Sequence, residues 1–278
     1  MKLNVNDVNL YIDIEGSGLV ARGNQMVEMP LLITLHGSYL DHSYFKPDLE
    51  PLLEICQIMH LDYRGFGRSD LSEQKYWNFD QFADDVVSAM DILGIEKAIL
   101  LGHSLGCHIG TNLTLRYADR VSSNIFINPA FLDLDIFFQN VLARAGIEAE
   151  LAARKVWLES DLDALNDYVD LVVPHLFYGE RPFDKETRGL TSFDFSLHTF
   201  DEVIETNLLQ QLRKVQVPTL LCNGLLDIYM PPGLPDKLAE EINNPKIKVE
   251  NFPEGAHCLL DDQTQKIMSS IRNFLNNL

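Results

Sequence analysis

Basic residues are scarce in this chain. Lys and Arg together number 22 in 278 residues, against 41 Asp and Glu, which gives a formal net charge of −19. Nucleic-acid binding depends on clustered Lys and Arg that neutralise phosphates, so we expect no nucleic-acid partner. The same excess of negative charge disfavours binding to an anionic membrane surface. The simplest consequence of so many acidic side chains is solubility.

The chain also has few cysteines, and none of them forms a Cys-x-x-Cys pair. The four are Cys56, Cys107, Cys222 and Cys258, and without paired spacing a zinc site is not expected. No apolar run approaches the roughly 20 residues that cross a bilayer, so we expect no membrane span. Residues 1–7 lack the apolar stretch of a secretory signal. Together these absences predict a cytoplasmic protein with reduced thiols.

What the sequence does contain, up to about residue 130, is a regular alternation of apolar strand-like runs and helical segments. This alternation favours a mostly parallel central sheet with helices on both faces, an α/β fold. A hairpin is expected at residues 3–14, and the polar, glycine-containing residues 15–29 are expected to form a loop. The later predicted strands are residues 31–35, 55–61, 98–101, 121–127, 217–222 and 247–252. The predicted core helices are residues 47–54, 79–93, 107–117, 234–242 and 261–278.

The alternation is interrupted at residues 131–200, where helical patterns occur without a clear strand. We therefore predict a core domain of residues 1–130 and 201–278, with residues 131–200 inserted as a helical cap over the carboxyl edge of the sheet. One cap helix is expected to begin at residues 160–163 and to end before Pro174. Two or three cap aromatics would line a pocket for a small-molecule substrate. The candidates are Phe131, Phe137, Phe138, Trp157, Phe177 and Tyr178.

The most informative stretch is Gly102-His-Ser-Leu-Gly106, which follows an apolar run and precedes a helical segment. A strand, Gly-x-Ser-x-Gly and a helix in succession are typical of a nucleophile elbow, whose glycines permit a tight turn. Ser104 would then present its hydroxyl as a nucleophile at the carboxyl end of a strand. The backbone N–H of Leu105, at the start of the helix, would donate to an oxyanion.

A serine nucleophile needs a base and an acid, and both are expected at the same sheet edge. His257, in the loop after the last predicted strand, is the candidate base. His108 is a weaker alternative, because its place on the elbow helix would bury it. Asp227, after the preceding strand, is the candidate acid, and Asp133 and Asp135 stay open as alternatives.

A second oxyanion donor is expected in the loop after residues 31–35. There His36-Gly-Ser38 would bring the backbone N–H of Ser38 near the elbow. With a nucleophile, a base, an acid and two N–H donors, the chemistry requires no metal ion and no organic cofactor.

Taken together, these motifs resemble the α/β-hydrolase superfamily over nearly the whole chain. The resemblance implies the α/β-hydrolase fold, and the order Ser104, Asp227, His257 is the order that accompanies its elbow. The motifs are His36-Gly37, Asp62-Tyr-Arg-Gly-Phe-Gly-Arg-Ser69, the elbow, Gly224-Leu-Leu-Asp227 and Gly255-Ala-His257.

Within that superfamily, residues 36–43 and 61–69 are similar to the proline iminopeptidase branch. That branch typically carries His-Gly-Gly-Pro-Gly in the first motif and Gly-Gly-Ser-Trp-Gly at the elbow. Here Ser38-Tyr-Leu40 replaces Gly-Pro-Gly, and His103 and Leu105 occupy the elbow. These differences favour a serine hydrolase that cleaves a small acyl substrate, a carboxylic ester or similar, through an acyl-enzyme. An aminopeptidase of the proline iminopeptidase type and a non-enzymatic ligand-binding member remain alternatives, and the oligomeric state is left open.

Overall fold

The computed structural model describes residues 1–38, 40–159, 161, 163–176 and 202–278. Within these residues the central sheet has eight strands in the order β1-β2-β6-β5-β7-β8-β9-β10. Strands β6, β5, β7, β8, β9 and β10 run parallel, whereas β2 is antiparallel to β6 and β1 is antiparallel to β2. The strands are β1 (Lys2–Val5), β2 (Val8–Glu15), β5 (Leu31–Leu35), β6 (Gln57–Leu61), β7 (Ala98–His103), β8 (Val121–Ile127), β9 (Thr219–Gly224) and β10 (Ile247–Phe252).

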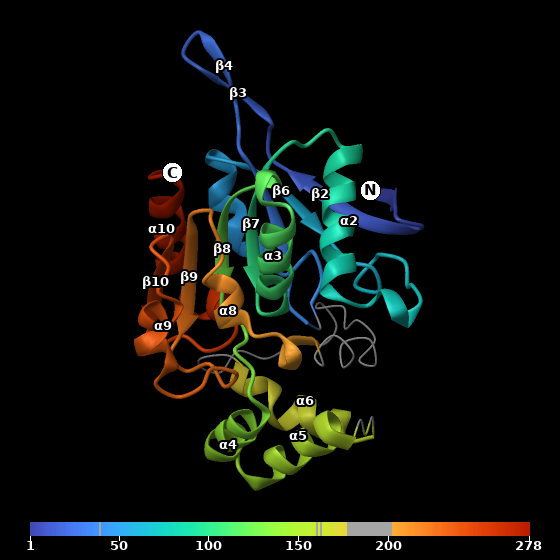
Figure 1. Ribbon diagram of the computed structural model, residues 1–278, viewed down its shortest axis with the longest axis vertical. Coiled ribbons are helices and arrows are strands. Elements are labelled where there is room, and N and C mark those ends of the chain that lie inside the picture. The colour runs from blue at the N-terminus through green and yellow to red at the C-terminus, as the bar shows by residue number, and fades with distance from the viewer. Residues whose placement is uncertain (39, 160, 162, 177–201) are drawn as a thin grey trace.

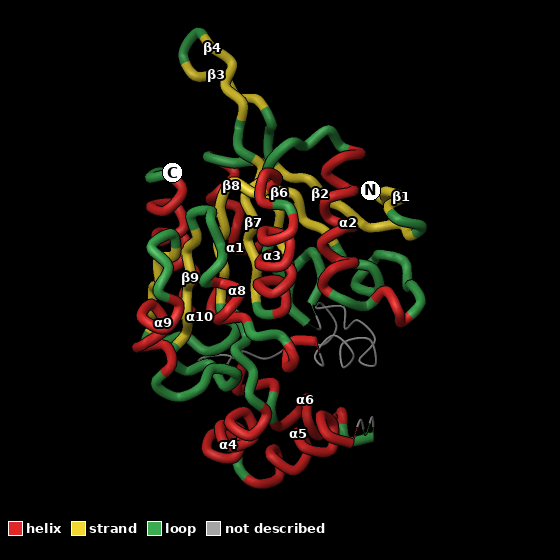
Figure 2. Tube along the Cα trace, in the orientation of Figure 1, coloured by secondary structure: helices red, strands yellow, loops and turns green. Residues whose placement is uncertain are grey.

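Helices cover both faces of this sheet, as the sequence predicts (Figure 2). Side chains alternate across a strand, so Ile33 of β5 faces the apolar cluster under α2 and α3 while Leu32 faces the cluster under α1 and α10. Every residue of β7 is buried, which explains its continuous apolar pattern. Outside residues 131–200, the described elements include the helices α1 (Lys46–Leu49), α2 (Phe79–Ile92), α3 (Leu105–Arg116), α8 (Leu208–Leu212), α9 (Leu234–Ile242) and α10 (Leu259–Leu275).

The limits of α2 have clear local causes. The Asn78 side chain accepts a hydrogen bond from the backbone N–H of Gln81 and so caps the first turn of α2. Beyond the last turn, Gly94 takes a φ of 69°, a conformation that costs glycine little.

Short 3-10 turns join several of these elements. The described ones are η1 (Glu50–Glu54), η2 (Gln74–Tyr76), η3 (Ala118–Arg120) and η4 (Val173–Leu176).

The described residues between β8 and residue 176 form three helices and a 3-10 turn, and the three helices lie together at one end of the molecule (Figure 1). The helices are α4 (Leu134–Ala145), α5 (Ile147–Glu159) and α6 (Leu165–Leu171). Their apolar side chains form a cluster with Tyr229 and Cys258, which follow β9 and β10. The helices therefore pack over the carboxyl end of the sheet, which supports the proposed cap. The limits of the proposed cap at residues 131 and 200 stay a prediction. Of the residues named for this region, Ser160, Leu162, Phe177 and Tyr178 lie outside the described residues.

Residues 15–29 differ from the prediction of a loop. They contain a two-stranded hairpin, β3 (Leu19–Arg22) and β4 (Gln25–Glu28), whose turn includes Gly23 at a φ of 63°. The hairpin projects from the end of the molecule opposite α4 and α5 (Figure 1). Its strands are exposed or half-buried, so they show no buried-face alternation that could have revealed them in the sequence.

No described helix combines the length and the apolar character needed to cross a bilayer.

Candidate active site

Ser104 occupies a strained turn between β7 and α3. Its φ and ψ are 52° and −114°, a conformation that a non-glycine residue adopts only at a cost. The turn is tight, because a Cβ on Gly106 would lie 1.9 Å from the carbonyl oxygen of Leu35. A Cβ on Gly102 would lie 2.7 Å from the carbonyl oxygen of Gly106. These contacts explain both glycines of the Gly-x-Ser-x-Gly motif, and the turn has the form expected of a nucleophile elbow.

The structure brings together the predicted acid and the predicted base. Asp227 lies after β9 and His257 after β10, and Asp227 Oδ2 is 2.8 Å from His257 Nδ1. Both side chains are almost fully buried. The other carboxylate oxygen of Asp227 accepts a hydrogen bond from the backbone N–H of Tyr229 at 2.8 Å. A carboxylate on Nδ1 fixes the imidazole so that Nε2 is the nitrogen able to accept a proton.

The imidazole of His257 lies beside the elbow. Its ring centroid is 5.0 Å from that of His103, the residue directly before Ser104. The Tyr229 ring meets it edge-on, with centroids 4.6 Å apart. Two elements distant in sequence, β7 and the loop after β10, therefore meet where the motif predicts a nucleophile and a base.

The loop after β5 passes directly against the elbow. A Cβ on Gly37 would lie 3.3 Å from the Cβ of Ser104 and 2.8 Å from His103 Nδ1. Ser38 is the next residue, so its backbone lies in the segment that borders the elbow, and Leu105 is the first residue of α3. Both predicted oxyanion donors thus belong to segments adjacent to Ser104, which is compatible with the roles assigned to them. Tyr39 lies outside the described residues.

The alternative residues occupy other positions. His108 is fully buried and donates to a backbone carbonyl from Nε2 at 2.8 Å, and burial lowers its pKa to about 4. His36 is also buried and donates from Nδ1 to a backbone carbonyl at 2.9 Å, a bracing contact for its loop. Asp133 caps α4 by accepting a backbone N–H, and Asp135 is exposed in the first turn of that helix. Asp227 is therefore the acid that the geometry favours.

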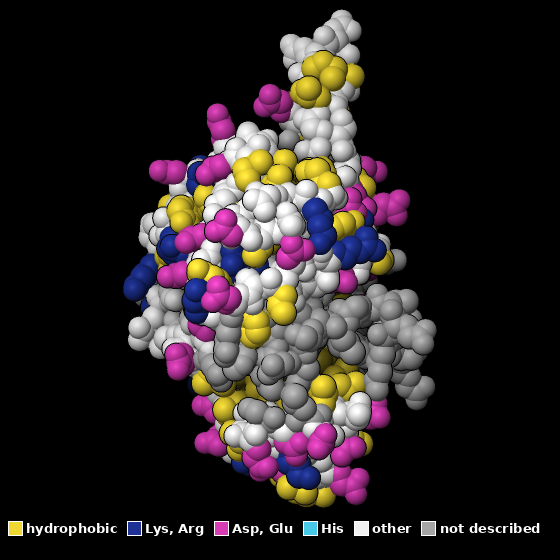
Figure 3. Space-filling model, turned by 90° about the vertical axis from the view of Figure 1, so that its right-hand side faces the viewer, with side chains coloured by type: hydrophobic (Ala, Val, Ile, Leu, Met, Phe, Trp, Pro, Cys, Tyr) yellow, Lys and Arg dark blue, Asp and Glu magenta, His cyan; other side chains and the backbone are white. Residues whose placement is uncertain are grey.

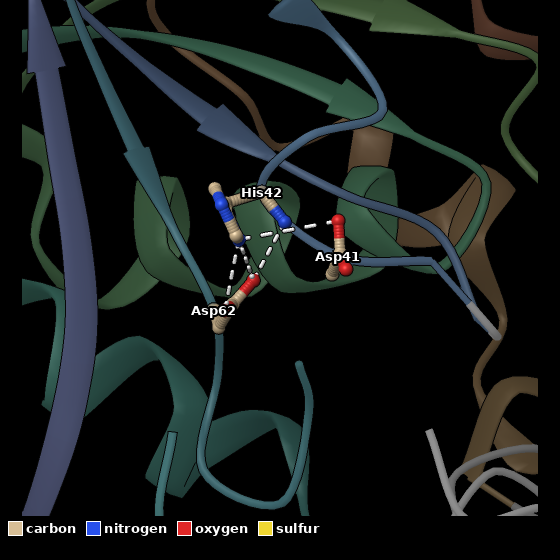
Figure 4. Close-up of side chains that lie close together, drawn as sticks. All are labelled: Asp41, His42 and Asp62. Carbon is tan, nitrogen blue, oxygen red and sulfur yellow. Dashed lines mark hydrogen bonds and ion pairs between the residues drawn. The ribbon is translucent and has the colours of Figure 1, made fainter. Parts of the chain in front are cut away.

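A second cluster of titratable groups, Asp41, His42 and Asp62, lies on the loops after β5 and β6 (Figure 4). Asp62 is fully buried and accepts the backbone N–H of His42 at 2.6 Å, the His42 ring N–H at 3.0 Å and the backbone N–H of Arg68 at 2.8 Å. Burial raises the pKa of Asp62, but the hydrogen bond from the His42 ring and the two backbone donors outweigh it and lower the pKa.

The carboxylate of Asp62 thus already accepts three hydrogen bonds, which leaves it few lone pairs for a metal ion. A Cβ on Gly67 would lie 2.4 Å from Asp62 Oδ2, so the chain also closes tightly over the carboxylate. We interpret the cluster as a brace that ties the loop carrying Ser38 to the end of β6. Sequence reasoning gave His42 no role, because its partner is 20 residues away and has no recognisable spacing.

Comparison with known proteins agrees with the architecture. The family model described as the alpha/beta hydrolase fold matches residues 30–264. A putative carbamate hydrolase RutD from Caulobacter sp. (strain K31) is 24% identical over 242 residues, which cover 84% of this chain and 86% of that protein. Proline iminopeptidase PfmaB from Pestalotiopsis fici is 25% identical over 276 residues, covering 94% of this chain and 98% of that protein.

Among solved structures, the enol-lactonase from Burkholderia xenovorans LB400 superposes with a TM-score of 0.76 at 19% identity, covering 99% of this chain and 100% of that one. At this identity the likeness concerns the fold alone. The family match extends over most of the chain and spans the positions of Ser104, Asp227 and His257. The chain therefore belongs to the α/β-hydrolase fold family and is a hydrolase of that family.

Proposed function

We propose that the protein is a serine hydrolase that cleaves small acyl substrates, a carboxylic ester or similar, through an acyl-enzyme. The observation that carries this proposal is the 2.8 Å hydrogen bond between Asp227 and His257, formed beside the strained turn of Ser104. A related chain, the putative carbamate hydrolase, is named for another carbonyl substrate, and this supports the same reaction class. We include in the proposal a cytoplasmic location and the absence of any cofactor requirement.

In the first half of the proposed reaction, Ser104 Oγ attacks the substrate carbonyl carbon while its proton passes to His257 Nε2. Asp227 holds the imidazole and stabilises its positive charge. The backbone N–H groups of Ser38 and Leu105 donate to the oxyanion of the tetrahedral intermediate. His257 then gives the proton to the leaving alkoxide or amine, and the acyl group remains on Ser104.

In the second half, His257 takes a proton from water, and the resulting hydroxide attacks the acyl carbon. A second tetrahedral intermediate forms in the same oxyanion site. Its collapse breaks the bond to Ser104 Oγ, which regains a proton from His257 Nε2, and the carboxylic acid is released. The enzyme returns to its starting state with no external redox or metal step.

The direct test is Ser104→Ala assayed on short p-nitrophenyl esters. Loss of the nucleophile is expected to lower kcat by about 10⁴-fold or more. Ser269→Ala, in an exposed position of α10, is the matched control and should retain wild-type kcat. A fluorophosphonate probe should label the wild type at Ser104 and should not label Ser104→Ala. Equal turnover by the folded wild type and Ser104→Ala would exclude this mechanism.

An aminopeptidase is the second candidate, favoured by the similarity to a proline iminopeptidase. The same nucleophile would attack an N-terminal peptide bond, and selectivity would depend on the free amine of the substrate. Comparison of proline β-naphthylamide with p-nitrophenyl acetate separates the two functions. A higher kcat/KM for the amide, lost when its amine is acetylated, would favour the aminopeptidase.

A further inference from the structure

Asn128 lies directly after β8, at the point where the chain leaves the sheet. Its backbone has a left-handed φ of 45°, and its side chain is completely buried. Its backbone N–H donates to the carbonyl of Cys222 in β9 at 2.8 Å, and the preceding residue, Ile127, accepts the N–H of Ser104 at 3.1 Å. Asn128 therefore sits where β8 is joined both to the elbow and to the strand that leads to Asp227.

The side-chain amide of Asn128 binds three backbone groups. Its Nδ2 donates to the carbonyl oxygens of Ala256 at 2.6 Å and His257 at 2.7 Å. Its Oδ1 accepts the N–H of Gly224 at 2.7 Å. An amide side chain offers two donors and an acceptor, and here these connect the loop of the proposed base with the end of β9.

The carbonyl oxygen of His257 receives a second hydrogen bond, from His103. The distance from His103 Nε2 to this oxygen is 3.0 Å. A carbonyl can only accept, so His103 Nε2 carries the hydrogen. The carbonyl oxygen of the proposed base consequently accepts hydrogen bonds from His103, the last residue of β7, and from Asn128, the residue after β8.

We propose that Asn128 and His103 are positioning residues for His257, an inference that rests on the proposed function. Neither side chain is assigned a contact with substrate. Each fixes the backbone from which the imidazole reaches Asp227 on one side and the elbow on the other. Proton transfer from Ser104 depends on this placement, and a displacement of about 1 Å can lower turnover about 100-fold.

The test compares Asn128→Ala with Asn124→Ala. Asn124 is a matched control, because it is a fully buried asparagine on β8, the strand that Asn128 directly follows. Its side chain bonds to the hydroxyls of Thr114 and Thr219 and not to the base loop. Both variants should lose stability in urea unfolding. Only Asn128→Ala is expected to lower kcat and the rate of fluorophosphonate labelling by about 100-fold, with KM within about twofold of wild type.

A second pair of variants covers the case in which Asn128→Ala does not fold. His103→Gln retains an N–H donor toward the His257 carbonyl, whereas His103→Leu removes it. We expect His103→Gln to keep a kcat at least tenfold above that of His103→Leu, each measured on protein with a cooperative unfolding transition.

The inference is overturned if folded Asn128→Ala is labelled as fast as Asn124→Ala, or if the two His103 variants have equal kcat. Failure of the proposed function gives a different pattern. In that case the wild type would not be labelled by the probe, or Ser104→Ala would hydrolyse esters at the wild-type rate.

Discussion

Glu202 is a partly buried acid that contacts the first turn of α2. Its Oε2 accepts the backbone N–H of Phe79 at 2.7 Å. Burial raises the pKa of Glu202 to about 7, the hydrogen bond from Phe79 opposes this, and the negative charge of Asp80 adds to it. The charged carboxylate is therefore disfavoured in the folded protein relative to the unfolded chain.

This raised pKa predicts a pH-dependent stability. Glu202 stabilises the fold fully below its unfolded pKa of about 4.5, and this contribution is lost as the pH rises toward 7. Glu202→Gln stays neutral and can still accept the N–H of Phe79, so it should be more stable than wild type at pH 8. In urea unfolding, the unfolding free energy should fall less between pH 5 and pH 8 for Glu202→Gln than for wild type. The control Glu240→Gln, an exposed acid on α9, should keep the wild-type fall, and equal falls for Glu202→Gln and wild type would contradict the assignment.

At the level of elements, α4 is tied to the loop that carries Asp227. Asn140 Nδ2 donates to the carbonyls of Ile228 at 2.9 Å and Met230 at 3.3 Å. Phe137, one turn earlier on the helix, stacks on Tyr229 with ring centroids 5.0 Å apart. A helix of the proposed cap thus contacts the loop that carries both the proposed acid and Tyr229, whose ring borders His257.

We predict that Asn140→Ala lowers kcat by about tenfold. A tenfold loss of kcat corresponds to about 1.4 kcal/mol of transition-state stabilisation. The physical reason is that the loop of Asp227 loses two hydrogen bonds, each worth about 0.5–1.5 kcal/mol. Steady-state kinetics on a p-nitrophenyl ester measure the effect. Gln139→Ala, its exposed neighbour on α4, should match wild type. An unchanged kcat for Asn140→Ala would show that the position of this loop does not depend on α4.

The elements that the sequence revealed are those with a buried face. Strands β5, β7 and β8 were predicted to within two residues, because most of their residues are buried and their sequences are rich in apolar residues. Hairpin β3–β4 was missed because it buries little. Ser104, Asp227 and His257 are found by local motifs and chain order, and their roles stay a proposal. Asn128 could be read only as the end of a strand, since its partner His257 is 129 residues away.

For the molecule as a whole, the dominant electrostatic feature is the net charge of −19. Acidic side chains are spread over the face shown in Figure 3, with fewer basic ones between them. Many like charges at a short mean spacing repel one another and oppose the compact state. Bulk electrostatics therefore act against the packing described above, even where individual ion pairs form.

We expect added salt to stabilise the fold. Raising NaCl from 0.01 M to 0.1 M shortens the Debye length from about 30 Å to about 10 Å and screens this repulsion. The midpoint of thermal unfolding should rise over that range, and KCl should act like NaCl if screening is the cause. A fall of the midpoint would mean that attractive surface ion pairs outweigh the net repulsion.

The projecting β3–β4 hairpin also offers a way to attach the enzyme to a solid support. Its base is closed by a hydrogen bond from the N–H of Met29 to the carbonyl of Gly18 at 2.9 Å, and Asn24 at its turn is exposed. The four native cysteines are all buried, so Asn24→Cys would introduce a thiol far more accessible to maleimide than any of them. The hairpin and α4–α6 lie at opposite ends of the molecule (Figure 1). In protein coupled through residue 24, the proposed cap would therefore point away from the support and toward the solution.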